Sequence, residues 1–313
     1  TITEKGIWSA ALLADLGFVP VITPVSNPAI AQMGVDHSRT DFCISRKLVT
    51  GHTMLLMNHP GVRYVLNPSF VEQFQKDSHS LKYCIYTASE AFILNDDLSI
   101  DPARQISPVL QFGEPRILVD NLRRELAARG FTFARRRIEQ AVQAAEQAEN
   151  AFAAELARIG DTFMERIRNN IAYVGIGRDY VMLDPEASSY AGSMFSQVRG
   201  LEFIPQIFLK HRFGPLEKSQ QDTEYWCESI DILRAHDYTV SHSNLYPIRL
   251  MNFGCGPDSV KLYHEERIQA QAHKPMLVLL TDAQTNNAPF VTRTEAFERV
   301  VNQHYQTREY TDD

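Results

Sequence analysis

The sequence predicts an α/β protein in which a mainly parallel, doubly wound sheet occurs twice. Short apolar segments alternate with helical patterns along most of the chain, the order expected where helices join parallel strands. A long stretch rich in Ala, Glu, Gln and Arg separates two such alternating blocks. In the second block the apolar run Leu245–Phe253 ends in Gly254-Cys255-Gly256, and Pro257 then opens a helix. A strand therefore passes into a helix at a cysteine, on the edge where such sheets bind ligands.

Chain length and charge limit the class of protein. The 313 residues are enough for two domains with separate cores. A net charge of −7 at neutral pH argues against a surface for nucleic acid or anionic membrane. No apolar run approaches the roughly eighteen residues of a membrane span, and no signal-peptide pattern opens the chain. We therefore expect a cytoplasmic protein with neither nucleic acid nor membrane as a partner.

The first alternating block, residues 1–113, is expected to fold as one α/β lobe. The strands are assigned from β-branched and apolar runs, and the helices from apolar residues at helical spacing. The predicted elements are a helix over Trp8–Phe18, a strand over Val19–Thr23, a helix over Ser26–Gly34 with Asn27 as its cap, a helix over Ser45–Met57, a helix-to-strand step over Gly61–Pro68 and a strand over Pro108–Phe112.

A helical segment, residues 114–170, is expected to bridge the two lobes. It has one predicted break, at Arg129-Gly130-Phe131, followed by a continuous helical pattern over Arg135–Ile167. The basic run Arg135-Arg136-Arg137 has two interpretations, a phosphate contact or a solvated helix face. Glutamates further along the helix, beginning with Glu139, offset this charge and favour the solvated face.

The second alternating block, residues 171–313, is expected to form the other lobe. Its predicted elements are strands over Ile171–Ile176, Phe203–Leu209, Leu245–Phe253 and Met276–Thr281, and helices over Ser188–Val198, Asp222–Ala235 with Asp222 as its cap, Pro257–His273 and Thr292–Tyr305. Gly175-Ile176-Gly177 begins a dinucleotide fingerprint, but the third glycine is absent, so we predict no nicotinamide site. The sequence contains no P-loop either.

Three of the four cysteines fall on loops that can share one rim of the predicted sheets. Cys43 stands just before a helix, Cys84 ends a loop, and Cys255 lies at a strand-to-helix junction. Free N–H groups and the helix dipole favour a thiolate at Cys255, whereas a buried small hydrophobe is the alternative interpretation of a single cysteine. Cys227 lies inside a predicted helix and is interpreted as core or helix surface. The cysteine spacings form no Cys-x-x-Cys zinc pattern.

Four segments carry motifs that bear comparison with a known family. They are Cys43-x-x-x-Lys47-x-x-x-Gly51-His52, Gly177-Arg178-Asp179-Tyr180 with Asp184-Pro185-Glu186, Asn252-Phe253-Gly254-Cys255-Gly256-Pro257-Asp258, and Asp282 followed by Arg293-Thr294-Glu295-Ala296-Phe297. Together, and over nearly the whole chain, they resemble the DUF2229-type domain of the 2-hydroxyacyl-CoA dehydratase and CoA-enzyme activase superfamily. The chain departs from the family pattern at Asp179, where Pro is usual.

This resemblance implies a fold and a cofactor. The fold would be two flavodoxin-like lobes, the first of them lacking its opening strand. The cofactor would be a 4Fe–4S cluster held by three cysteines: Cys43 and Cys255 match family motifs, and Cys84 falls where another ligand is expected. Thiolates are the normal ligands of such clusters, and three of them leave one iron open. Backbone N–H groups of Gly254 and Gly256 would donate to cluster sulfurs.

The residues and the resemblance support two hypotheses about function. In the first, the chain is an iron–sulfur protein or segment that works with an ATP-hydrolysing activase domain or subunit. It would carry out low-potential electron transfer to an acyl-CoA-like or other unreactive substrate, in a reductase or 2-hydroxyacyl-CoA dehydratase-like system. In the second, it is a non-catalytic scaffold that docks an activase, with its cysteines empty or binding zinc. Lys47 and His52 either pack on the helix surface or lie in the layer of residues around the cluster. The sequence leaves open whether the chain forms a homo-dimer or a hetero-dimer.

Overall fold

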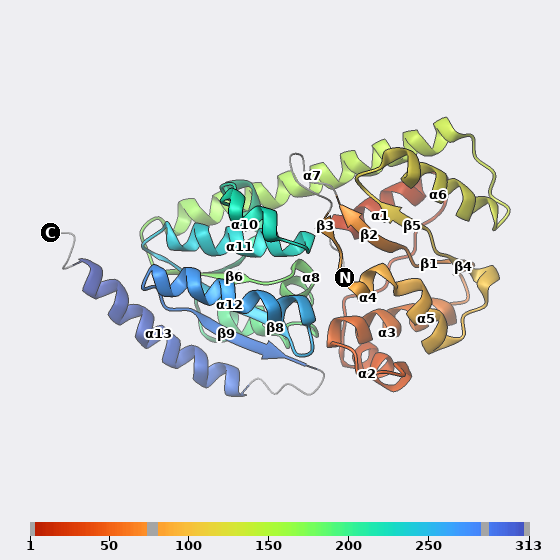
Figure 1. Cartoon of the computed structure of the whole chain (residues 1–313). Helices are drawn as coiled ribbons and strands as arrows, with labels where there is room; N and C mark the ends of the chain where they lie inside the picture. The colour runs from red at the N-terminus through yellow and green to blue at the C-terminus, as the bar shows by residue number, and fades with distance from the viewer. Residues whose placement is uncertain (1–3, 74–80, 283–287, 310–313) are drawn as a thin grey trace. The chain divides into compact units, whose positions relative to one another are not determined.

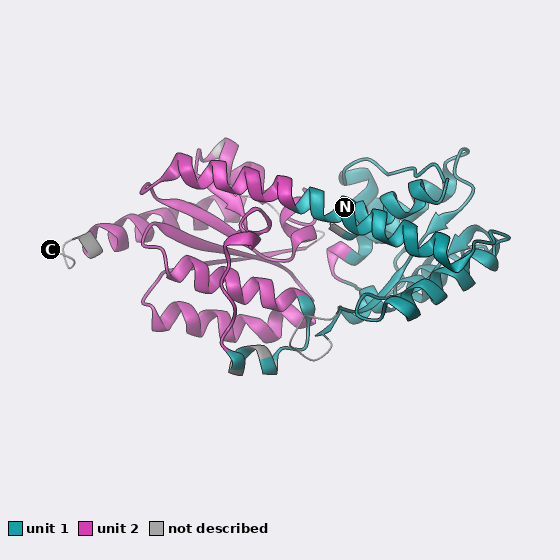
Figure 2. Cartoon of the chain, turned by 90° about the horizontal axis from the view of Figure 1, so that it is seen from above, with its two compact units in different colours: residues 1–42, 46–153, 218–227 teal, residues 43–45, 154–217, 228–313 magenta. Residues whose placement is uncertain are grey.

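The computed structural model describes residues 4–73, 81–282 and 288–309. The chain divides into two compact units, drawn in teal and magenta in Figure 2. Unit 1 comprises residues 1–42, 46–153 and 218–227, and unit 2 comprises residues 43–45, 154–217 and 228–313. The division falls inside the 33-residue helix α7 (Arg135–Ile167), so this one helix supplies residues to both units.

Unit 2 is built on a four-stranded parallel sheet (Figure 1). Its strands are β6 (Ala172–Ile176), β7 (Phe203–Pro205), β8 (Leu245–Asn252) and β9 (Leu277–Thr281). They lie in the order β7-β6-β8-β9, and each pairing is parallel. Because the order reverses between β6 and β8, the sheet is doubly wound. The predicted α/β, flavodoxin-like arrangement with parallel strands is confirmed.

Helices cover both faces of the unit 2 sheet. They are α8 (Asp179–Leu183), α9 (Ala191–Ser193), α11 (Cys227–Val240), α12 (Gly256–Gln271), α13 (Ala288–Glu309) and the second part of α7. On one face, Met182 of α8 and Phe297 of α13 belong to the core with Tyr246 of β8. On the other, Phe163 of α7 and Ile232 of α11 pack with alternate strand residues. Burial on both faces explains why β6 and β8 have continuous apolar sequences.

Unit 1 contains two parallel strand pairs and one antiparallel strand. The strands are β1 (Val65–Leu66), β2 (Ser69–Gln73), β3 (Leu81–Lys82), β4 (Gln105–Ile106) and β5 (Val109–Gln111). β1 pairs with β4 and β2 pairs with β5, both parallel, while β3 joins β2 antiparallel. Pro68 and Pro108, which lack an N–H, separate β1 from β2 and β4 from β5.

The helices of unit 1 pack around these strands. They are α1 (Glu4–Asp15), α2 (Pro28–His37), α3 (Ile44–Asn58), α4 (Ile85–Ala88), α5 (Glu90–Leu98), α6 (Pro115–Ala127), α10 (Lys218–Thr223) and the first part of α7. Asn27 caps α2 as predicted, since its Oδ1 accepts from the N–H groups of Ala29 and Ile30, both at 3.1 Å. A Cβ at Gly51 of α3 would lie 2.2 Å from the carbonyl oxygen of Ile30 in α2, so glycine is needed where these two helices touch.

Two local predictions are wrong, and a third, the strand over Phe203–Leu209, is correct only up to Pro205, because a 3-10 turn over Gln206–Phe208 follows it. The segment Val19–Thr23, predicted as a strand, belongs to no strand pair in the described part of the chain. Asp222 does not cap a helix, because α10 ends at Thr223 and α11 begins at Cys227. The residues between them pair with β3 instead: Trp226 forms a parallel bridge with Lys82, and the carbonyl of Tyr225 accepts the N–H of Lys82 at 2.8 Å. The predicted division into residues 1–113, 114–170 and 171–313 stays a prediction.

Candidate functional site

The carboxyl ends of β6 and β8 meet where the strand order of unit 2 reverses. Gly177 and Arg178 follow β6, and Phe253, Gly254 and Cys255 follow β8. In doubly wound sheets, ligands bind outside this edge and next to the reversal. We therefore take this edge as the candidate site. Cys255 lies in it, as the sequence predicts.

Cys255 occupies the N-cap position of α12. Gly254 before it has φ of +76°, a backbone conformation that other residues adopt only with strain. A Cβ added at Gly254 or at Gly256 would meet no atom within 4 Å, so the backbone on both sides of the cysteine faces open space. The carbonyl of Cys255 accepts from the N–H of Ser259 at 3.0 Å and from its Oγ at 2.8 Å. The first turn of α12 is thus fixed by hydrogen bonds, while the space next to Gly254 and Gly256 is open.

The protonation of Cys255 differs from the sequence-based expectation of a thiolate. Burial raises the pKa of the Cys255 thiol to about 12, although Arg178 and the backbone of Asp258 lower it. The side chains of Asp258 and Cys43 raise it further, because both carry negative charge when ionised. The helix start alone does not offset the burial of the Cys255 side chain, which is 7% exposed. Since the charge of Arg178 does not offset burial either, a thiolate at this position requires a metal ion as its partner.

Cys43 belongs to the same unit as Cys255. The segment Cys43–Ser45 is part of unit 2, and Ser45 Oγ donates to Asn252 Oδ1 at 2.5 Å. Asn252, at the end of β8, is itself fixed by donating to the carbonyl of Ala187 at 2.9 Å and to Thr281 Oγ1 at 2.6 Å. Cys43 is close enough to act on the pKa of Cys255. Two of the three predicted ligand cysteines therefore come together at one edge.

Arg178 is the buried cation of the site. Its Nε donates to Asp258 Oδ1 at 3.0 Å, and its Nη1 donates to Glu228. Its Nη2 is buried and has no hydrogen-bond partner among the residues that the structure describes. The guanidinium also lowers the pKa of the neighbouring Cys255. A positive charge with one unused donor thus lies beside the thiol.

A second buried ion pair joins α12 to the sheet. Arg249 of β8 donates from Nε to Glu265 Oε2 at 2.6 Å, and both side chains are fully buried. His236 of α11 lies 3.3 Å from the same carboxylate oxygen. Arg249 also reaches Asp258, with Nη2 to Oδ1 at 3.4 Å. The helix that begins at Cys255 is therefore anchored by two of its own carboxylates, those of Asp258 and Glu265, to Arg249 on the sheet.

Sequence reasoning missed the role of Arg178 and Arg249. Arg178 is part of a motif that carries the family resemblance but is given no role in it, and Arg249 is part of a run interpreted only as a buried strand. A charged residue within an eight-residue strand that is buried throughout is the signal that could have found Arg249. Such a charge needs an opposite partner. Asp258 and Glu265 on the following helix are candidates for this partner.

The other two cysteines are assigned to unit 1. Cys84 belongs to unit 1, where it is half-buried at the N-cap of α4. Cys227 is buried at the first residue of α11. Among the described residues, no disulfide joins any of the four cysteines, and no group of three or more His, Cys, Asp or Glu side chains is arranged to hold a metal ion. Membership of Cys84 in a ligand set therefore stays a prediction from sequence.

Lys47 and His52, which follow Cys43 in the first motif, contact residues of unit 1. Lys47 Nζ lies 2.5 Å from Asp41 Oδ1, and His52 Nε2 lies 2.8 Å from Ser26 Oγ. Ser26 precedes α2, so His52 ties α3 to the chain that leads into α2. These contacts favour the packing interpretation of both residues.

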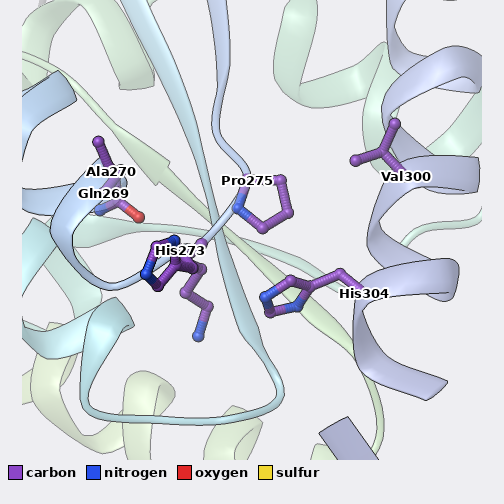
Figure 3. A pocket seen from close by; sticks show the side chains of 7 residues that line it. Gln269, Ala270, His273, Pro275, Val300 and His304 are labelled. Carbon is purple, nitrogen blue, oxygen red and sulfur yellow. The ribbon is translucent and has the colours of Figure 1, made fainter. Parts of the chain in front are cut away.

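A separate hollow of about 370 Å³ lies at the other end of α12. Figure 3 shows His273 and Pro275 on one side of it and Val300 and His304 of α13 on the other. The 16 residues of α12 span about 24 Å at the rise of an α-helix, so this hollow is a helix length away from Cys255. His304 Nδ1 is within 2.9 Å of the Tyr246 hydroxyl. We therefore do not assign the function to this hollow.

The fold and the site define a doubly wound α/β protein with two thiols and a buried guanidinium at the reversal of its sheet. A family model described as "CoA enzyme activase uncharacterised domain (DUF2229)" matches residues 2–207. The chain belongs to this family. The matched region includes Cys43, Cys84 and Arg178 and ends before Cys255. A search of curated proteins found no match. In the described part of the chain, no helix combines the length and the apolar character needed to cross a membrane.

Proposed function

We propose that this chain is an iron–sulfur protein or segment that acts with an ATP-dependent activase in low-potential electron transfer. The acceptor would be an acyl-CoA-like or otherwise unreactive substrate, reduced or dehydrated by the system. One observation carries the proposal: Cys43 and Cys255 belong to one unit, and Cys255 lies at the reversal of the sheet beside the buried guanidinium of Arg178. Membership in an activase-related family supports the same class of system.

The donor set fits a 4Fe–4S cluster. Cys43 and Cys255 would supply two thiolates, and Cys84 is the third ligand that the resemblance implies, on the sequence alone. A cluster with three protein ligands keeps one iron open, and when bound it would accept and pass on single electrons. Coordination to iron also explains how a thiol with a pKa of about 12 would lose its proton, since metal ligation deprotonates cysteine.

The surrounding residues would bind and orient this group. Arg178, through its Nη2, offers a charge-assisted donor to a sulfur atom. Asp258 and Glu228 hold the guanidinium from the protein side. The open backbone at Gly254 and Gly256 leaves room for a bulky group next to Cys255. Hydrogen-bond donors to the sulfur atoms raise the reduction potential of a cluster, whereas surroundings rich in carboxylates lower it.

The alternative is a non-catalytic scaffold of the same fold that docks an activase, with its cysteines empty or binding zinc. The observations that favour it are the protonated state of Cys255 and the lack of a three-residue metal group among the described residues. In that case the arginine–carboxylate network would serve stability alone. Both functions involve an activase partner. The presence of a cluster is therefore the property that distinguishes the two.

Anaerobic purification followed by iron and acid-labile sulfide analysis is the experiment that tests the proposal. We expect brown protein that contains iron and sulfide in comparable amounts and absorbs in the visible range. Colourless protein that cannot be reconstituted with iron and sulfide contradicts the proposal. Stoichiometric zinc in place of iron supports the scaffold.

A further inference from the structure

The hollow at the carboxyl end of α12 is formed by residues of unit 2 alone. Its volume of about 370 Å³ lies at the lower end of the range found for pockets that hold small molecules. Val300, on one side of it, is 50% exposed, and His273 on the other is exposed as well. A small molecule could therefore enter the hollow from solvent.

Gln269 of α12 brings an unused hydrogen-bond acceptor to this hollow. Its side chain is 3% exposed, and its Nε2 lies 2.9 Å from His236 Nδ1. Its Oε1 is buried and has no hydrogen-bond partner among the residues that the structure describes. Figure 3 shows this oxygen on the side of Gln269 that faces His273. A buried acceptor without a partner is unfavourable, and a donor on a bound ligand would satisfy it.

A chain of buried groups sets the orientation of this amide. Burial raises the pKa of Glu265, but Arg249 and His236 outweigh it and lower the pKa to about 2, so the carboxyl is ionised. His236 Nε2 lies 3.3 Å from Glu265 Oε2, and a ring nitrogen that faces a carboxylate carries the proton. Nδ1 of His236 is then an acceptor, which takes its hydrogen bond from the NH₂ group of Gln269. The amide oxygen is thereby fixed as an acceptor, and a ligand has to donate to it.

Flat rings lie on opposite sides of the hollow. His273 and Pro275 are on one side and His304 is on the other (Figure 3). Tyr246 fixes the ring of His304, since its hydroxyl is 2.9 Å from Nδ1 and the two rings meet edge to face, with 5.6 Å between their centroids. Histidine rings bind nucleobases and other flat heterocycles by stacking. The lining thus favours a flat, unsaturated ligand.

Lys274, which also lines the hollow, directs its charge into the protein. The side chain is 4% exposed, and its Nζ donates to the carbonyl of Thr239 at 2.7 Å and to the carbonyl of His242. Nζ also lies 4.9 Å from the centroid of the Tyr246 ring. The ammonium is therefore engaged by groups of the protein itself. An uncharged ligand fits this lining better than one that carries a phosphate.

We propose that this hollow binds a flat, uncharged heterocyclic base that carries an exocyclic amine, such as an aminopurine. The amine would donate to Gln269 Oε1, and the ring would lie between His273 and His304. The site is at the opposite end of α12 from Cys255. It therefore depends neither on a cluster nor on the function proposed for the thiol site.

A matched pair of bases tests the role of the amine. Adenine carries an exocyclic amine where hypoxanthine carries a carbonyl oxygen, and the two are otherwise similar in size and shape. The readout is ligand-observed NMR titration with the full chain, which gives the Kd of each base. We expect adenine to bind about tenfold or more tightly than hypoxanthine, because the carbonyl of hypoxanthine would set two acceptors against each other. Gln269→Met, which removes the acceptor, should reduce this difference to within about twofold.

A second pair of variants tests the place of binding without touching the buried amide. Val300→Trp puts a large side chain into the hollow from α13, whereas Gln303→Trp puts one on an exposed position of the same helix outside the lining. Val300→Trp should abolish adenine binding, and Gln303→Trp should change the Kd by no more than about twofold. Thermal unfolding followed by circular dichroism checks that both variants are folded.

Three results would overturn the proposal. The first is a lack of adenine binding to the wild-type chain up to about 1 mM. The second is equal affinity for adenine and hypoxanthine, or adenine binding that persists in Val300→Trp. The third is binding of adenosine monophosphate about tenfold or more tightly than adenine, because a phosphate would then be the group that is recognised.

Discussion

Arg249 and Glu265 form a bidentate ion pair inside unit 2, with Nε to Oε2 at 2.6 Å and Nη2 to Oε1 at 3.2 Å. Neither side chain is accessible to solvent. The pair joins the middle of β8 to the third turn of α12, the helix that Cys255 begins. Burying such a pair costs free energy, because both charges lose their hydration. Its contribution is to fix the geometry of the two elements that it joins. Here it fixes the direction in which the helix leaves the sheet.

The acid stability of the protein should depend on Glu265. Burial raises the pKa of this carboxyl, but Arg249 and His236 outweigh it and lower the pKa from 4.5 to about 2. The ionised form is thus favoured in the folded state. Its stabilisation is complete above pH 4.5 and is lost as the pH falls towards 2, a difference of about 3 kcal/mol. Glu265→Gln should reduce the free energy of unfolding at neutral pH by about 3–5 kcal/mol, because it leaves the buried Arg249 with only the longer ionic contact to Asp258.

Urea unfolding between neutral pH and pH 3 measures this effect. The deficit of the Glu265→Gln variant should shrink below pH 4.5, where the native carboxyl begins to lose its advantage. Glu266→Gln, one residue along and exposed, is the matched control and should change stability by less than about 0.5 kcal/mol. A deficit that does not vary with pH would mean that Glu265 is not ionised in the fold.

The contact between α2 and α3 should not tolerate a side chain. A Cβ at Gly51 would lie 2.2 Å from the Ile30 carbonyl oxygen, so Gly51→Ala has to push two helix backbones apart. We expect a loss of about 2 kcal/mol or more. Gly214→Ala is the control, because a Cβ there meets no atom within 4 Å, and it should be neutral within about 0.5 kcal/mol. Equal midpoints of chemical unfolding for the two variants would contradict the close packing.

The cysteines should differ in their effect on bound iron. Cys43→Ser, Cys84→Ser and Cys255→Ser should each lose the cluster, whereas Cys227→Ser should keep it, since Cys227 is enclosed at the start of α11. Iron, sulfide and visible absorption of each anaerobically purified variant measure this. If Cys227→Ser bleached the protein as fully as Cys255→Ser, the ligand assignment would be wrong. Retention of the cluster in Cys84→Ser alone would limit the error to the residue assigned from sequence only.

Reduction of the cluster should require ATP hydrolysis. The chain carries 38 acidic against 31 basic residues, and adding an electron to a centre already ligated by thiolates costs free energy, so we expect a low potential. The spectrum of the protein, mixed anaerobically with a reduced activase, should change with ATP and not with a non-hydrolysable analogue. Equal reduction with both nucleotides, or fast reduction by a mild donor without activase, would argue against an ATP-gated acceptor.

The parts of the fold that depend on local pattern were predictable, and those that depend on distant partners were not. The strand before Cys255 and the helix after it follow from an apolar run, two glycines and a proline, all local. Val19–Thr23 has an equally clear strand composition, but a strand also needs a neighbour to accept its backbone groups. Asp222 failed as a cap because Tyr225 pairs with Lys82, more than a hundred residues away in sequence.

The same distinction applies to the site. Cys255 was predicted from its place at a strand-to-helix junction, but its protonation depends on the burial and charges that the tertiary fold brings to it. In the sequence, Arg178 is only one residue of the motif Gly177–Tyr180, because its partners Asp258 and Glu228 lie 80 and 50 residues further along. Residue type and spacing thus found the thiol, whereas its electrostatic surroundings required the structure.

The sharing of Arg249 between two carboxylates has a consequence for the helix that Cys255 begins. Asp258 in the first turn of α12 and Glu265 in its third turn both contact this arginine of β8. The helix is therefore held to one strand at two points along its length. A helix held in this way cannot pivot about its first turn, so the thiol at its N-cap keeps its position relative to the sheet.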